Sequence, residues 1–144
     1  MSVVIRRAST EDVPELMELE AALFDNAMSE TTLERELVAG EGYLVRQWHE
    51  SSAILGYILV REDGDLLDIT RLGVRPEAQC LGLGTTLLKY ILDRERTTVL
   101  TVKKGNARAL RLYKRHGFVV VGHFIEARAW VLRRDARPAA PTAP

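Results

Sequence analysis

The sequence contains little cysteine, few prolines before its last eight residues and no long apolar stretch. Cys80 is the one cysteine among 144 residues, so no intramolecular disulfide can form and a disulfide-stapled secreted scaffold is excluded. No apolar run approaches the roughly 20 residues that span a bilayer, and Met1–Arg7 lacks the order of a secretory signal. We therefore expect a cytoplasmic protein without a membrane span.

Net charge is also absent, because 20 basic residues balance 20 acidic ones. No global field would draw nucleic acid or an anionic membrane to the surface, and neither partner is expected. Local positive charge does gather late in the chain, at Lys103, Lys104, Arg108, Arg111, Lys114 and Arg115. Two interpretations stay open for this group: attraction of the phosphates of a ligand, or a solvated helix face.

The composition is that of an ordinary globular protein, with 47% apolar and 28% charged residues. The length suits one domain, which we expect over residues 1–135. Residues 136–144 hold three of the five prolines and no large apolar side chain. Such a Pro/Ala segment buries too little surface to offset its ordering entropy, so we expect a disordered tail.

Hydrophobic periodicity and turn signals predict strands and helices in the order βααβββαβαββ. The expected strands are Val3–Ala8, Tyr43–Trp48, Ile54–Arg61, Leu66–Val74, Thr97–Val102, Phe118–Ile125 and Ala127–Leu132. The expected helices are one capped by Thr10, one from Ser29 or Thr31 to Gly40, and those over Gly82–Arg94 and Asn106–His116. Such mixed connections indicate an α/β sandwich with a mixed sheet.

A glycine-containing loop, Gln79–Leu88, follows a predicted strand and opens an apolar helix. Glycines at this junction let the backbone approach a ligand, and the first helical turn presents unpaired N–H groups, which suit a phosphate. A nucleoside-triphosphate loop would need lysine where Thr85 stands, and a dinucleotide fingerprint would need glycine where Leu87 stands. The alternative is that the glycines only permit tight helix–sheet packing.

A second segment, Asn106–Phe118, begins with a good helix N-cap and ends with a glycine. Taken together, the two segments resemble the GNAT acetyltransferase superfamily. Its acyl-CoA loop matches Gln79-x-x-Gly82-x-Gly84, and its later motif matches Asn106, Ala109, Leu112, Tyr113, Gly117 and Phe118. The resemblance implies a mixed, mostly antiparallel twisted sheet flanked by helices. It also implies transfer of an acetyl group from acetyl-CoA to a primary amine, without a metal.

The resemblance also implies roles for individual residues. The backbone of Leu72, Gly73 and Val74 would bind the pantetheine arm, and Asn106 would be a polar contact beside the cofactor. The pyrophosphate would be held by the loop residues Gln79, Cys80, Leu81, Gly82, Leu83, Gly84 and Thr85. Tyr113 would be the general acid, because a phenol with a pKa of about 10 is protonated at pH 7 and can protonate the departing thiolate.

The general base is less evident. Thr101 stands where the ribosomal-protein N-terminal acetyltransferase branch has a glutamate, and it cannot serve as a base. Other branches place a carboxylate at the position of Asp68, which we therefore predict as the base; the alternative is an aspartate that only contacts solvent. An α-amine of pKa about 8 is roughly one-tenth neutral at pH 7, whereas lysine is neutral about once in 2500, so a weak base suits an α-amine.

The acceptor is predicted from a third likeness. Leu23–Ser29 resembles the stretch that forms the acceptor wall in the ribosomal-protein branch, so a peptide or protein N-terminus is the leading acceptor. One alternative is a small-molecule amine such as an antibiotic or polyamine, which an acidic cleft would favour. Another is a non-catalytic acyl-CoA sensor, which would need the loop but not Tyr113. Strand-edge dimers are common in this fold, so a homodimer is expected.

Overall fold

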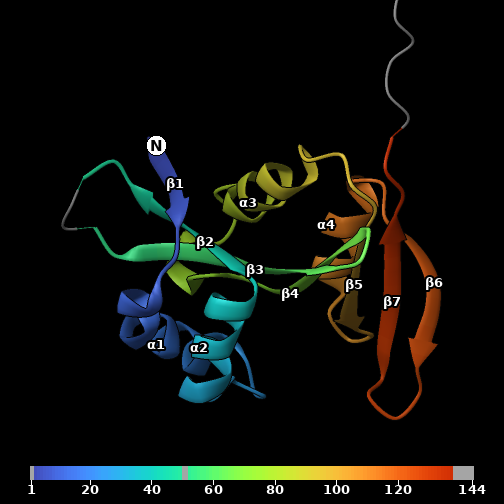
Figure 1. The fold of residues 1–144 in the computed structure, drawn as a ribbon, viewed down its shortest axis with the longest axis horizontal. Helices are drawn as coiled ribbons and strands as arrows, with labels where there is room; N and C mark the ends of the chain where they lie inside the picture. Colours follow the sequence, from blue (N-terminus) through green and yellow to red (C-terminus); the bar gives the residue numbers. More distant parts are fainter. Residues whose placement is uncertain (1, 50–51, 138–144) are drawn as a thin grey trace, which may run out of the picture.

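The computed structural model describes residues 2–49 and 52–137, and its elements follow the predicted order (Figure 1). The strands are β1 (Val3–Arg7), β2 (Glu41–Gln47), β3 (Ile54–Asp63), β4 (Leu66–Val74), β5 (Thr98–Lys103), β6 (Val119–Phe124) and β7 (Ala129–Arg134). The helices are α1 (Val13–Leu23), α2 (Glu30–Ala39), α3 (Leu83–Leu92) and α4 (Ala107–Arg115), with short 3₁₀ turns at Thr10–Asp12 and Pro76–Ala78. Of the predicted tail, residues 138–144 lie outside the described residues, and the amide of Ala136 donates to Thr97 Oγ1 over 3.0 Å.

The seven strands form one sheet in the order β1-β2-β3-β4-β5-β7-β6. Every neighbouring pair is antiparallel except β4 and β5, which are parallel. Helices α1 and α2 lie on one side of the sheet and α3 on the other (Figure 1). The prediction of a mixed, mostly antiparallel sheet flanked by helices is confirmed.

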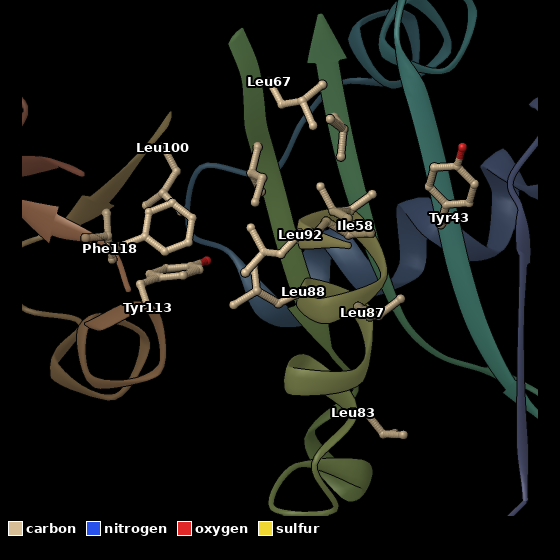
Figure 2. Packing of buried hydrophobic residues seen from close by; sticks show 14 of the residues in the cluster. Tyr43, Ile58, Leu67, Leu83, Leu87, Leu88, Leu92, Leu100, Tyr113 and Phe118 are labelled. Carbon is tan, nitrogen blue, oxygen red and sulfur yellow. The ribbon is translucent and has the colours of Figure 1, made fainter. Parts of the chain in front are cut away.

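Two apolar clusters, one on each face, hold these layers together. On the α1/α2 face, Leu16 and Leu33 pack with Tyr57 of β3. On the α3/α4 face, Leu88 packs in a cluster that includes Ile58 (Figure 2). Because adjacent strand residues point to opposite faces and both faces are covered, β3 carries an almost continuous apolar run.

The helix starts show which predicted caps were right. Asn106 caps α4 as predicted, since its Oδ1 accepts from the amide of Ala109 over 3.1 Å. For α2 the cap is Ser29, whose Oγ accepts from the Thr32 amide over 3.2 Å. The prediction of Thr10 as a cap was wrong: it lies inside the 3₁₀ turn, and the amide of Ser9 donates to the Asp12 carboxylate there.

The parallel strands β4 and β5 separate after a short pairing. Their paired residues run from Leu67 with Thr98 to Ile69 with Leu100. On the other side of β4, a register shift against β3 leaves Thr70 without a partner, which is a β-bulge at the point of separation. From there to Val74, the edge of β4 that faces β5 has no strand partner among the described residues. Its backbone groups are therefore open to a ligand, apart from the Val74 carbonyl, which accepts from Gln79 Nε2.

We expect Leu88→Ala to lower the free energy of unfolding by about 2–5 kcal/mol, because it leaves a cavity where a fully buried side chain packs under the sheet. Urea denaturation followed by circular dichroism measures this loss. Val38→Ala is the control, since Val38 is 76% exposed and should change stability by less than about 0.5 kcal/mol. Equal stability of the two variants would contradict the described core.

Candidate active site

The predicted loop and the open edge of β4 line one cavity of about 620 Å³, which we call the loop cavity. Its walls include the predicted site residues Leu72, Gly73, Val74, Gln79, Cys80, Gly82, Leu83, Gly84, Thr85, Asn106 and Tyr113. Leu81 does not line it and is 57% exposed. Residues that are up to 41 positions apart in sequence, from Leu72 to Tyr113, therefore meet around one space.

The loop glycines are not explained by close packing. Gly82 has φ +78°, a conformation that favours glycine, and an added Cβ there would have no neighbour within 4 Å. At Gly84, an added Cβ would lie 3.6 Å from Leu112, which is an ordinary contact. The glycines therefore leave the backbone accessible on the cavity side, at the start of α3, which favours approach by a ligand over tight packing.

Two arginine side chains lie beside this loop. The Arg108 guanidinium donates to Gln79 Oε1 over 3.0 Å and lies 3.1 Å from Cys80 Sγ. Gln79 in turn donates from Nε2 to the carbonyl of Val74 over 3.1 Å, which ties the loop to the end of β4. Arg115 also lines the cavity. A phosphate-bearing ligand would meet helix N–H groups and guanidinium groups together.

Tyr113 lies deep in the same cavity. Its side chain is 8% exposed and packs edge-on against Phe118, with ring centroids 5.7 Å apart (Figure 2). Burial raises the pKa of Tyr113 to about 12. The phenol therefore keeps its proton across the physiological range and has a proton to give. His116, at the C-terminal end of the same helix, lines neither cavity, and its Nδ1 lies 2.9 Å from the carbonyl of Leu112.

A second cavity, of about 330 Å³, meets the first at Tyr113, and we call it the acceptor-side cavity. The two cavities share the lining residues Phe24, Leu72, Asn106, Ala109 and Tyr113. The remaining walls come from both separated strands, from the α1–α2 connection and from the β6–β7 hairpin, which contributes Phe124 and Ala127. Phe24, from the stretch predicted to form the acceptor wall, lines both cavities, whereas the sequence analysis did not predict the contribution of the hairpin.

A buried charge cluster holds the stretch that contains Phe24 in place. Glu20 is fully buried and accepts hydrogen bonds from Tyr57 Oη (2.6 Å), the Met28 amide (2.9 Å) and two guanidinium nitrogens of Arg71 (2.7 and 2.9 Å). Arg71 also lies over the Phe24 ring, 3.9 Å from its centroid, and lines the acceptor-side cavity. Glu20 thus holds the α1–α2 connection against β4. Sequence analysis missed it, although Glu20 occupies the buried stripe of α1.

The charges of this cluster are strongly coupled. Burial raises the pKa of Glu20, but the hydrogen bonds from Arg71, Met28 and Tyr57 outweigh it, so the pKa is lowered from its ordinary value. Burial and the neighbouring Glu20 raise the pKa of Tyr57. The carboxylate therefore stays ionised although no water reaches it.

Asp68 is the predicted catalytic residue that the structure does not bring to the site. It lies on the paired half of β4, opposite Arg61 and Val99, and it lines neither cavity. Burial raises the pKa of Asp68, and Arg61 opposes that rise. Because neighbouring β4 residues Leu67 and Ile69 face α3, Asp68 faces the other side of the sheet. That is also the side of Arg71 and α1, but Asp68 is absent from both linings, so its assignment as the base stays a prediction.

The lining of the two cavities contains no Asp, Glu or His among the residues that the structure describes. Thr101, at the position of the glutamate of the ribosomal-protein branch, does line the acceptor-side cavity. In residues 2–49 and 52–137, no group of three or more His, Cys, Asp or Glu side chains is suited to hold a metal ion. The described part of the chain also has no helix with the length and apolar character needed to cross a membrane.

Comparison with known proteins identifies the class. A family model described as "Acetyltransferase (GNAT) family" matches residues 8–118. The chain is 30% identical over 148 residues to the N-alpha-acetyltransferase RimI of Mycobacterium tuberculosis (strain ATCC 25618 / H37Rv), and the match covers 93% of each chain. It is 27% identical over 139 residues to the 5-NmdU N-acetyltransferase of Pseudomonas phage PaMx11, with 92% of this chain and 99% of the phage protein covered.

A solved structure agrees with this likeness. The ribosomal-protein-S18-alanine N-acetyltransferase from Escherichia coli has the same fold, with a TM-score of 0.82 at 21% identity and 98% of both chains covered. The chain therefore belongs to the GNAT acetyltransferase family, and it is an N-acetyltransferase that uses acetyl-CoA as its cosubstrate. The resemblance inferred from two short motifs is confirmed.

We expect Glu20→Gln to lower the free energy of unfolding by about 3 kcal/mol at neutral pH, because the substitution breaks a buried ion pair. Since the pKa of Glu20 is lowered in the folded state, its contribution is present above the unfolded value of about 4.3 and disappears as the pH falls through the folded value. Urea unfolding across pH should therefore show the gap between wild type and variant shrinking below about pH 4.3. Glu18→Gln, an exposed change on the same helix, should show no such gap.

Proposed function

We propose that the protein acetylates the α-amine of a peptide or protein N-terminus, by direct attack of that amine on the thioester of acetyl-CoA. The observation that carries this proposal is the junction of two cavities at Tyr113. A thioester reaching along β4 through the loop cavity and an amine entering the acceptor-side cavity would meet beside that phenol. No acyl-enzyme intermediate is required by this arrangement.

Three features support an α-amine as the acceptor. The relative from M. tuberculosis is named an N-alpha-acetyltransferase. The stretch resembling an acceptor wall contributes Phe24 and Asn26 to the acceptor-side cavity. The described lining offers no carboxylate or imidazole base, and an α-amine needs one least because about a tenth of it is already neutral at pH 7.

Different residues along the loop cavity would have different roles in the reaction. The loop from Gln79 to Thr85, with Arg108, would hold the phosphates of the cosubstrate, while the open edge of β4 would bind its extended arm. An amide at Val74 would stabilise the developing oxyanion. Tyr113 would protonate the sulfur as the C–S bond breaks, and solvent would return that proton.

A small-molecule amine is the second candidate acceptor. It is favoured by the phage relative, which is named for 5-NmdU. The described lining carries cations and no acids, which disfavours polycationic acceptors such as polyamines. A sensor without turnover would bind acetyl-CoA and acetylate no amine.

Thiol release from acetyl-CoA with a panel of amines separates these candidates. The panel contains peptides with free N-termini, the same peptides blocked at the α-amine but carrying lysine, a polyamine, and a nucleoside with a primary amine. We expect the highest kcat/KM for the free N-terminal peptides. A higher value for any other class would overturn the acceptor assignment, and binding of acetyl-CoA without turnover would establish the sensor.

We expect Tyr113→Phe to lower kcat by about 10²-fold, because the variant loses the proton donor but keeps the ring that packs on Phe118. The Kd for coenzyme A, measured by calorimetry, should change little. Tyr90→Phe removes a hydroxyl from an exposed tyrosine of α3 and should retain wild-type turnover. Wild-type turnover in Tyr113→Phe would remove this residue from the mechanism.

A further inference from the structure

The acceptor-side cavity has an unusual balance of charge. Two cationic side chains line it, those of Arg71 and Lys103, and no Asp, Glu or His does so among the described residues. Arg71 is compensated by Glu20, which accepts two of its N–H groups at 2.7 and 2.9 Å. Lys103 takes part in no ion pair between described residues. The cavity lining therefore carries a net positive charge at Lys103.

The position of that charge is defined by a hydrogen bond. Lys103 Nζ at the end of β5 donates to the carbonyl of Ala127 in the β6–β7 hairpin over 3.0 Å, and both residues line the cavity. The neighbouring Lys104 is engaged elsewhere, with its Nζ 2.9 Å from His123 Nδ1 and 4.2 Å from the centroid of the Trp130 ring. The two adjacent lysines therefore differ in their access to the site, which provides a matched control.

Other charged groups on the surrounding elements do not cancel this charge within the lining. On the hairpin these are Glu126 and Arg128, and on the α1–α2 connection Asp25; none of the three lines the cavity. On α4 the titratable group at the cavity is Tyr113, which stays neutral because burial raises its pKa to about 12. An amine bound there would face Lys103 without an opposing carboxylate in the described lining.

We propose that Lys103 takes the place of a general base, because its positive charge disfavours the ammonium form of the bound acceptor and favours the uncharged nucleophile. This role rests on the proposed amine acetylation. The acceptor ammonium loses one proton to water, and its nitrogen forms the C–N bond as the C–S bond breaks. The nitrogen then loses a second proton to water, and the thiolate takes one from Tyr113, which solvent restores. One proton is released in all.

The size of the effect follows from simple electrostatics. A like charge favours the neutral form of an amine. If the pKa of a bound α-amine falls from about 8 to about 7, its neutral fraction at pH 7 rises from about one-tenth to about one-half, a roughly five-fold gain. Because the Lys103 side chain is exposed, salt should screen the interaction and reduce the gain.

The test is the pH dependence of acetylation in Lys103→Met. The single-turnover rate at saturating peptide reports the bound amine, whereas kcat/KM for the peptide reports the free amine. In wild type we expect the midpoint of the acid limb to lie about half a pH unit to one pH unit lower for the single-turnover rate than for kcat/KM. In Lys103→Met the midpoint for the single-turnover rate should shift to higher pH until it equals the midpoint for kcat/KM. The midpoint for kcat/KM should not change.

The controls isolate charge from structure. Lys103→Arg keeps the charge and should have the same single-turnover midpoint as wild type. Lys103→Gln removes the charge and should show the same shift as Lys103→Met. Lys104→Met, which removes the adjacent ammonium from the Trp130 ring, should leave the limb unchanged. Raising the salt concentration should shift the midpoint of the wild-type single-turnover profile to higher pH, and it should leave the midpoint of Lys103→Met unchanged.

Two outcomes would overturn the role of Lys103. One is an active Lys103→Met protein with the wild-type limb. The other is an unchanged limb with a raised KM confined to acceptors that carry an anionic group, which would make Lys103 a binding residue. The proposed function fails differently, because then wild type itself would acetylate no peptide α-amine at any pH.

Discussion

The separation of β4 from β5 is the constraint on which the site depends. The two parallel strands pair from Leu67 to Ile69 on β4, and the bulge at Thr70 coincides with the end of that pairing. Beyond it, backbone donors and acceptors that a continuous sheet would consume are left for a ligand. Residues of both separated strands line the acceptor-side cavity, which shares Tyr113 with the loop cavity, so the proposed site depends on this one local separation.

A buried carboxylate maintains the acceptor side of that gap. Glu20 would be costly to bury alone, but four hydrogen bonds surround it, and Arg71 supplies the opposite charge. Through Arg71 the cluster also orders Phe24, which both cavities share. Because Glu20 neutralises Arg71, Lys103 is the uncompensated cation in the described lining of the acceptor-side cavity. The packing of α1 and the electrostatics of that cavity are therefore linked.

Much of this arrangement could be predicted because it is local. Strand β4 has the predicted bounds, and Asn106 caps α4 because a side-chain oxygen two or three residues from an open amide needs no tertiary partner. The glycine loop could also be predicted locally, from its position between a strand and the start of a helix. Asp68 lines neither cavity because it lies on the half of β4 that is still paired with β5, so its role as the base stays a prediction. Thr10 was misjudged because a 3₁₀ turn intervenes before α1.

The sequence by itself determined the order of the elements, the glycine loop and the phenol of Tyr113, since periodicity, capping and motif spacing are properties of neighbouring residues. Only the tertiary structure decided which charges meet. Glu20, Arg71 and Tyr57 come from three separate elements, and Lys103 reaches the cavity only because β5 leaves β4 and the β6–β7 hairpin returns beside it. Such contacts depend on strand pairing between distant segments, and that pairing has no local signal along the chain.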